Sequence, residues 1–179
     1  GSHDIPYVGD PVALLTGGTY LNYHSQAFTG GQLRGQIVAS NELPTTRYAN
    51  LSIRGVAGAG DQVLIGGLSI SGTEPVRTLI TAKGPSLAAF GVTGAAVNPR
   101  LELYDSAGRL IAFNEDVGAI PAGSELALIP GVPVNPLECA LVVVLPPGNY
   151  TAHVSASSSS GVALLEINDL RSLGIAGIT

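Results

Sequence analysis

The sequence is built from short segments in which apolar and polar residues alternate, separated by clusters of Gly, Pro, Asn, Asp and Ser. The clearest segment covers residues 101–116, LELYDSAGRLIAFNED. Its pattern predicts two strands, residues 100–104 and 109–114, joined by an Asp-Ser-Ala-Gly turn in which Gly108 takes a positive φ. Alternation places Glu102 on the face opposite its two neighbouring leucines. We therefore expect a tight antiparallel hairpin at the centre of the fold.

Similar runs on both sides of this hairpin predict more strands. They cover residues 49–56, 62–71, 76–83, 138–145, 149–156 and 162–168. Evenly spaced short strands of this kind indicate an all-β fold, an antiparallel β-sandwich of the jelly-roll type. His153 falls on the polar face of its strand. An apolar, proline-rich segment, residues 117–136, precedes the 138–145 strand, and we expect a short helix there at residues 124–128 with Ser124 as its N-cap.

The first part of the chain has a different organisation. Residues 1–18 are expected to form an extended arm, and residues 19–28 and 32–39 the two strands of a hairpin with its turn at residues 29–31. A polar connector at residues 42–46 follows. The sequence thus predicts two domains, residues 1–44 with the arm and hairpin, and residues 45–179 with the sandwich.

Composition narrows the classes of protein to which the chain can belong. Charged residues make up 12% and hydrophobic residues 45% of the 179 residues, and the net charge is −5. Without a basic cluster, nucleic acid is not expected as a partner. No apolar run approaches the roughly 18 residues that cross a bilayer, so membrane insertion is not expected either. A surface this poor in charge favours self-association, although Ser, Thr, Gly and Asn on the surface would explain it equally well.

The single cysteine and the start of the chain bear on the cellular context. Cys139 lies in an apolar strand and is expected to be a buried, unreactive thiol. The chain starts at Gly1 and contains no methionine, as expected for a processed, trimmed or tagged product.

The segment YLNYHSQAFTGGQLRGQI, residues 20–37, resembles the closing hairpin of the CHRD domain, the module named after chordin. The matching residues are Tyr20, Asn22, His24, Gly30, Gly31, Arg34, Gly35 and Gln36. The resemblance covers about 20 residues, and the strands that normally precede this hairpin in the domain are missing. Because a two-stranded hairpin is marginally stable in water, it is expected to dock on the rest of the chain or on another copy.

Most of the second part resembles a β-sandwich module common in large secreted bacterial proteins. The matching motifs are Leu-Ile-Gly-Gly at 64–67, Gly-Pro-Ser-Leu at 84–87, Leu-Tyr-Asp-Ser-x-Gly at 103–108 and Pro-Gly-x-Tyr-Thr at 147–151. The hairpin and the Pro-Gly-x-Tyr motif are also similar to pre-peptidase C-terminal domains. The resemblance brings no catalytic set. It implies an exported bacterial protein, extracellular or at the cell surface, with an accessory or structural role.

Few residues have the pattern of a chemical site. No phosphate loop, dinucleotide fingerprint, zinc-binding helix or nucleophile elbow is present, so no enzyme activity and no organic cofactor are expected. Asp105, Asn114 and Asp116 are the candidate metal ligands, since calcium takes oxygen ligands from loops at a sandwich end, although ordinary turn chemistry explains them too. Asn50 and Asn149 lie in N-glycosylation sequences.

The sequence supports two alternative functions, one as a structural protein and one as a binding module. The first is a non-catalytic extracellular structural protein that self-associates by β-strand addition, such as a filament subunit in a homo-oligomer. The residues expected at its subunit interface lie in the N-terminal arm and the apolar tail: Ile5, Tyr7, Val8, Val12, Leu14, Leu173, Ile175 and Ile178. The second is an accessory module of a larger secreted protein that binds carbohydrate or another protein. The absence of Trp argues against carbohydrate, because sugar-binding surfaces usually need exposed aromatic rings.

Overall fold

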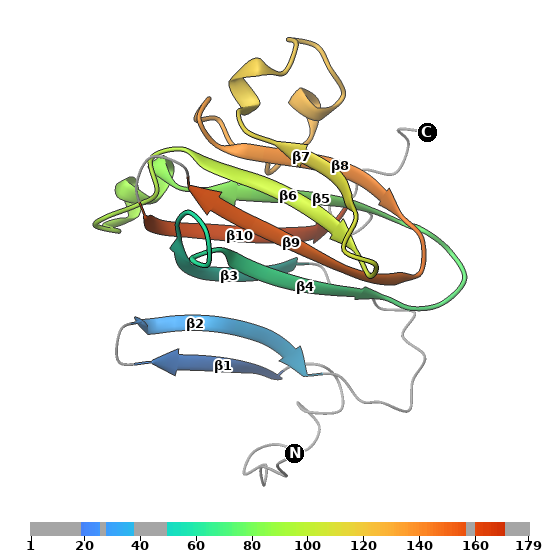
Figure 1. The fold of residues 1–179 in the computed structure, drawn as a ribbon, viewed down its shortest axis with the longest axis horizontal. Coiled ribbons are helices and arrows are strands. Elements are labelled where there is room, and N and C mark those ends of the chain that lie inside the picture. Colours follow the sequence, from blue (N-terminus) through green and yellow to red (C-terminus); the bar gives the residue numbers. More distant parts are fainter. Residues whose placement is uncertain (1–18, 26–27, 38–49, 157–159, 171–179) are drawn as a thin grey trace, which may run out of the picture. The chain divides into compact units, whose positions relative to one another are not determined.

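A computed structural model describes residues 19–25, 28–37, 50–156 and 160–170 (Figure 1). The chain divides into two compact units, residues 1–47 and residues 48–179. The predicted interface residues of the arm and the tail, residues 1–18 and 171–179, lie outside the described residues.

The first unit contains one antiparallel hairpin. Its strands are β1, Thr19–Ser25, and β2, Phe28–Ile37. The register runs from Thr19 opposite Ile37 to Ser25 opposite Phe28. The turn expected at residues 29–31 is therefore wrong, because those residues belong to β2, whose first residue, Phe28, already pairs with Ser25. Gly adopts extended conformations as readily as turn conformations, so the Gly-Gly pair alone did not locate the reversal.

The described residues of the second unit, 50–156 and 160–170, form eight strands and three short 3₁₀ helices. The strands are β3 (Asn50–Ala57), β4 (Leu64–Ile70), β5 (Val76–Lys83), β6 (Pro99–Asp105), β7 (Leu110–Asn114), β8 (Cys139–Leu145), β9 (Gly148–Ala156) and β10 (Gly161–Asp169). The 3₁₀ helices are η1 (Pro85–Phe90), η2 (Val117–Ala119) and η3 (Leu126–Leu128). All eight predicted strands are present, with bounds that differ by at most two residues.

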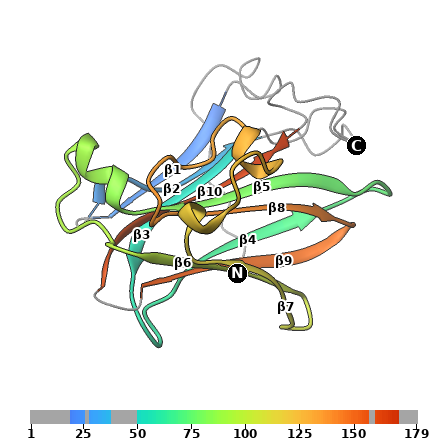
Figure 2. The ribbon, with the colours of Figure 1, turned by 90° about the horizontal axis from the view of Figure 1, so that it is seen from above.

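These strands form two packed antiparallel sheets. Sheet A has the order β3-β10-β5-β8 and sheet B the order β4-β9-β6-β7 (Figure 2). The pairs are nested, with β3 beside β10, β4 beside β9, β5 beside β8 and β6 beside β7. Eight strands nested in this way around a central hairpin form a jelly roll. The predicted all-β sandwich is confirmed, and the β6–β7 hairpin is at its centre.

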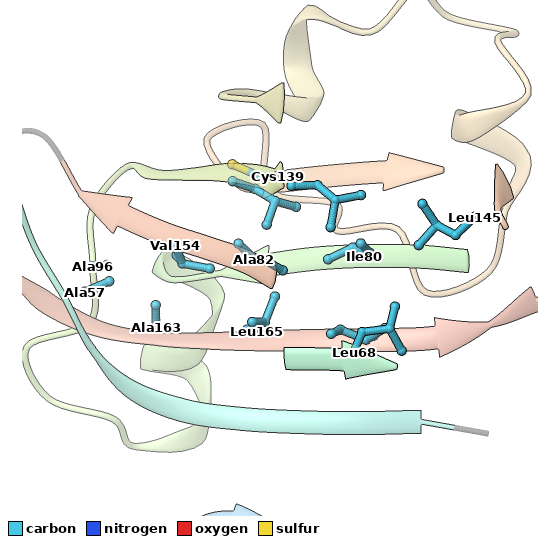
Figure 3. Close-up of a cluster of buried hydrophobic side chains, with 14 of the residues drawn as sticks. Ala57, Leu68, Ile80, Ala82, Ala96, Cys139, Leu145, Val154, Ala163 and Leu165 are labelled. Carbon is cyan, nitrogen blue, oxygen red and sulfur yellow. The ribbon is translucent and has the colours of Figure 1, made fainter. Parts of the chain in front are cut away.

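The main core lies between the sheets, and it follows the period-two pattern of the sequence. Ile80 from sheet A and Leu101 and Val154 from sheet B have no exposed surface. Figure 3 shows side chains of both sheets pointing toward one another, with Leu165 near the middle of the cluster. His153 and Glu102 are directly opposite each other in the register and lie on the outer face of sheet B, as the alternation predicted.

The turn of the β6–β7 hairpin has the predicted chemistry. The Oδ1 atom of Asp105 accepts hydrogen bonds from the backbone N–H groups of Ala107 at 2.9 Å and Arg109 at 3.0 Å. Gly108 has a φ of 74°, which an L side chain rarely adopts. Local residues alone therefore explain this turn.

Residues 117–137, which we call the cap, cover part of the outer face of sheet A. The yellow-to-orange segment in Figure 1 is found beside β8. Leu79 of β5 and Ala140 of β8 point out of the sandwich, yet they are 0% and 1% exposed, because they form a second small core with Ile129 of the cap. The helix expected at residues 124–128 is shorter than predicted and is a 3₁₀ helix. Only the 3₁₀ turn η3 forms, and the Ser124 hydroxyl caps nothing.

Candidate association site

The candidate site is the free edge of sheet B at β4. Within residues 50–156 and 160–170, no strand pairs with the side of β4 that faces away from β9. The strand has the sequence LIGGLSI, seven residues without a charge or a proline. All seven pair with β9 in one unbroken register. A flat, uncharged strand edge presents unpaired backbone N–H and C=O groups to another strand, and most soluble proteins protect such edges.

The two glycines of β4 have different roles. A Cβ atom on Gly66 would lie 2.6 Å from Cδ2 of Leu165 and 2.9 Å from Cδ1 of Ile53, so this glycine allows the two sheets to pack closely. A Cβ atom on Gly67 would meet nothing within 4 Å. Gly67 thus leaves the middle of the edge open on its outer side.

The sheet edges at β7 and β8 are better protected than the edge at β4. β7 has only five residues, and its pairing with β6 is interrupted by a register shift between Leu103 and Tyr104. At β8, the Val117 N–H donates to the carbonyl oxygen of Glu138 at 2.7 Å, and the Ala140 N–H donates to Oδ1 of Asn114 at 3.1 Å. These bonds occupy the start of the β8 edge. Of these three edges, β4 offers the longest uninterrupted stretch to an added strand.

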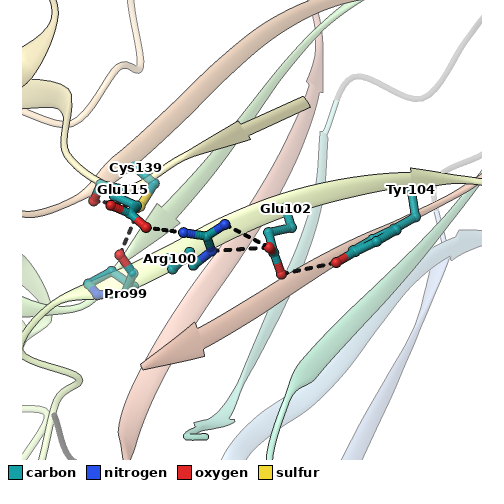
Figure 4. A network of polar contacts seen from close by, with 6 residues as sticks. All are labelled: Pro99, Arg100, Glu102, Tyr104, Glu115 and Cys139. Carbon is teal, nitrogen blue, oxygen red and sulfur yellow. Dashed lines mark hydrogen bonds and ion pairs between the residues drawn. The ribbon is translucent and has the colours of Figure 1, made fainter. Parts of the chain in front are cut away.

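The outer face of sheet B next to this edge carries a polar network (Figure 4). The guanidinium group of Arg100 donates two hydrogen bonds to Oε1 of Glu102, at 3.0 and 2.9 Å, and also pairs with Glu115. The hydroxyl of Tyr104 donates to Oε2 of Glu102 at 3.2 Å. The bond to Glu102 raises the pKa of Arg100. Burial, reinforced by the charge of Glu102, raises the pKa of Tyr104, so both groups keep their protons at neutral pH.

Aromatic contacts extend the network across the sheet. The rings of Tyr104 and His153 have centroids 4.6 Å apart. The guanidinium of Arg100 lies 4.9 Å from the centre of the Phe113 ring, which is 55% exposed. Nε2 of His153 is 3.2 Å from Oγ1 of Thr151. The polar groups of this network therefore have hydrogen-bond or ion-pair partners within it.

Two of the three predicted metal ligands, Asp105 and Asn114, lie at opposite ends of the β6–β7 hairpin. Asp105 lies at the turn end of the β6–β7 hairpin, whereas Asn114 pairs with Leu101 at the opposite end. Asp105 is four positions along β6 from Leu101, which corresponds to about 13 Å. The carboxylate of Asp105 is bound by Arg109, and the backbone N–H of Arg109 lowers its pKa. No group of three or more His, Cys, Asp or Glu in the described residues is arranged to hold a metal ion.

The remaining candidates have structural partners. Exposed Asn50 donates to Oδ1 of Asn168 at 2.7 Å, and exposed Asn149 accepts a hydrogen bond from Ser69 at 2.5 Å. Glycosylation of Asn50 and Asn149 stays a prediction. Cys139 is fully buried, and desolvation raises its pKa to about 12. Its Sγ atom lies 3.0 Å from the carbonyl oxygen of Pro99 and 3.1 Å from that of Glu115, so the single S–H proton is shared between two acceptors.

Sequence reasoning missed a buried carboxylate. Glu138 is 1% exposed, and its Oε1 atom accepts from the N–H groups of Gly84 and Ser86 at 2.8 and 2.9 Å, and from the Ser86 hydroxyl at 2.6 Å. The carboxylate thus holds the start of η1, where a Cβ on Gly84 would overlap the carbonyl oxygen of Ala96. The Gly-Pro-Ser-Leu motif therefore has a structural role, which is to place η1 against Glu138. A serine and a carboxylate without a histidine do not form a nucleophilic triad.

Comparisons with known proteins give a distant similarity. No family model matches the sequence, and no curated protein matches it. Among solved structures, the fold is similar to a pre-peptidase C-terminal domain of collagenase from Bacillus anthracis, with a TM-score of 0.43 and 13% identity over 67% of this chain and 90% of that chain. The jelly-roll assignment rests on the strand order and not on this similarity. The resemblance of residues 19–38 to a CHRD hairpin stays a prediction. Among the described residues, no helix is both long and apolar enough to cross a membrane.

Proposed function

We propose that this chain is a non-catalytic, extracellular structural protein that self-associates by β-strand addition, as a filament subunit does. The observation that carries the proposal is the β4 edge, Leu64–Ile70, which is seven residues long, uncharged and free of bulges. A strand added to such an edge gains main-chain hydrogen bonds along its whole length, and alternate side chains supply specificity.

The donor strand in this proposal is the N-terminal arm of a neighbouring copy. Residues 1–18 include the apolar side chains Ile5, Tyr7, Val8, Val12 and Leu14. When the arm of each copy reaches the edge of the next, the contact is head-to-tail, and repetition gives an open filament unless the rotation closes into a ring. A low fraction of charged residues, 12%, reduces repulsion between copies.

The test is a lysine placed on the β4 edge. Gly67→Lys adds a charge where no atom lies within 4 Å of the new Cβ, so the fold is retained while strand addition is opposed. Thr151→Lys is the matched control, because Thr151 pairs with Gly67 on the adjacent central strand and shares its outer face. Particle size is measured at micromolar concentration by light scattering and negative-stain microscopy, with thermal unfolding as the check on folding.

We expect fibres or large oligomers for the unaltered chain and for Thr151→Lys, and a folded monomer of 18.1 kDa for Gly67→Lys. Deletion of residues 1–18 is expected to give the same monomeric state. An unaltered chain that is monomeric under these conditions contradicts the proposal, as does assembly that Gly67→Lys leaves unchanged.

A second candidate function is an accessory module that binds carbohydrate or protein. The observation in its favour is the presence of three rings on the outer face of sheet B, the half-buried Tyr104–His153 pair and exposed Phe113. Sugars stack on exposed rings of this kind. Binding on a glycan array that Phe113→Ala abolishes would favour carbohydrate as the ligand, and no binding at all would remove carbohydrate from this candidate function.

A further inference from the structure

The cap contains an apolar pocket that the proposed function does not use. The pocket has a volume of about 290 Å³ and is lined by nine residues, all apolar or glycine. All nine belong to the cap, residues 117–137, in which Glu125 is the sole charged residue. Glu125 pairs with Arg77 of β5, which ties the cap to sheet A. The side chains that line the pocket are uncharged and carry no hydrogen-bonding groups, so they suit an apolar side chain, while backbone polar atoms form the rest of its surface.

The pocket adjoins the second small core. Val117, Ile129 and Val132 line the pocket and also take part in the cluster around Leu79. Leu170, which directly follows β10 and is 1% exposed, belongs to the same cluster. The chain thus leaves the described fold beside the pocket wall.

The residues that follow have the composition that the pocket requires. Residues 171–179 read RSLGIAGIT, with one charge, at Arg171, and with apolar side chains at Leu173, Ile175 and Ile178. Leu173 is three residues beyond Leu170, a span of at most about 10 Å. A segment tethered this close to a site has an effective concentration in the millimolar range there, so its own chain is favoured over another copy as the source of the tail.

We propose that the cap pocket binds the C-terminal tail of the same chain, with Leu173 as the side chain that fills it. The tail then packs on the outer side of the cap, while Leu170 packs on its inner side with Leu79 and Ile129. This assigns Leu173, Ile175 and Ile178 to an intramolecular contact instead of the subunit interface expected from the sequence. Strand addition between copies then depends on residues 1–18 and β4.

The experiment compares Leu173→Asp with Ser172→Asp in the full chain. Both add one negative charge to the tail, but only the first removes the apolar side chain. Carboxypeptidase digestion measures access to the tail, and hydrogen exchange measures opening of the cap, with β9 (Gly148–Ala156) as the internal reference. Both variants also carry Gly67→Lys, so that the result does not depend on assembly between copies.

We expect Leu173→Asp to speed tail digestion about tenfold or more, because burial of a leucine side chain is lost. Exchange in residues 117–137 is expected to rise with it while β9 stays unchanged, and Ser172→Asp is expected to match the parent protein. Equal digestion and exchange for the two variants would overturn the proposal. Protection that increases with protein concentration would also overturn it, because the tail would then bind another copy.

Discussion

The two outer faces of the sandwich differ in what they carry and in what covers them. On sheet A, Leu79 and Ala140 point outward and are buried by the cap. On sheet B, the outward residues include Arg100, Glu102 and Tyr104, which form hydrogen bonds and ion pairs among themselves. No segment of the described part of the chain covers that network with apolar side chains. The outer face of sheet A is thus partly buried in a second core, whereas the outer face of sheet B is exposed to solvent.

The difference follows from the sequences of the strands. β6 reads PRLELYD and alternates, so one face is apolar and the other polar. β8 reads CALVVVL and is apolar on both faces. A strand that is apolar on both sides needs cover on both sides. The proline-rich cap supplies it over Ala140, whereas Val144 near the end of the strand is 61% exposed. Substitutions beneath the cap are therefore expected to cost much more stability than substitutions on the outer face of sheet B.

Truncation of the covered leucine is the most severe test of this contrast. Leu79→Ala removes a fully buried side chain beneath the cap and is expected to lower the free energy of unfolding by about 2–5 kcal/mol. Phe113→Ala removes a larger but exposed ring on the other face, and a loss of about 0.5–1 kcal/mol is expected. Urea unfolding measures both. Equal losses would mean that the cap does not form a core.

The carboxylate just before β8 is the next test. Glu138→Ala leaves the N–H groups of Gly84 and Ser86 buried without an acceptor, and a loss of about 2–4 kcal/mol is expected. Glu138→Gln retains an acceptor oxygen and should recover more than half of that loss. If the two variants are equally unstable in urea, the hydrogen bonds to η1 are not what this residue contributes.

The polar network on the open face is expected to contribute little. Arg100→Gln removes two ion pairs, but the Arg100 side chain is 35% exposed and its partner Glu115 is 54% exposed. Water screens such pairs, so the expected loss is about 0.2–1 kcal/mol and should shrink further in about 1 M NaCl. A loss comparable to that of Leu79→Ala would show that the two faces contribute alike.

The smallest effect concerns Asp105 at the hairpin turn and depends on pH. Hydrogen bonds from Arg109 and Ala107 lower the pKa of Asp105 in the folded state. A folded pKa below the unfolded value of about 3.9 gives stability that is present above about pH 4 and is lost as pH falls through the folded pKa. Asp105→Asn removes this ionisable group. The difference in free energy of unfolding between the parent protein and this variant should therefore become smaller as pH falls below about 4. A difference that stays constant from neutral pH down to about pH 2.5 would contradict this.

The candidate site was only partly visible in the sequence. The absence of charge in LIGGLSI could be read directly, but its position at a sheet edge could not, because alternation does not say which strands are neighbours. The same limit applied to the metal prediction. Asp105 and Asn114 are nine positions apart along the chain, and only the pairing of β6 with β7 shows that they lie at opposite ends of the hairpin; calcium binding stays a prediction.

The sequence by itself determined the strands, their inward and outward faces, and the Asp105–Gly108 turn. Each of these depends on side chains within a few positions of one another, where alternation and backbone preference act locally. Only the tertiary structure decided the nested strand order, the burial of Leu79 under the cap and the partner of Glu138. Those features depend on contacts between distant segments, such as the 52 positions between Ser86 and Glu138, and a local pattern does not say which distant surface will exclude water from it.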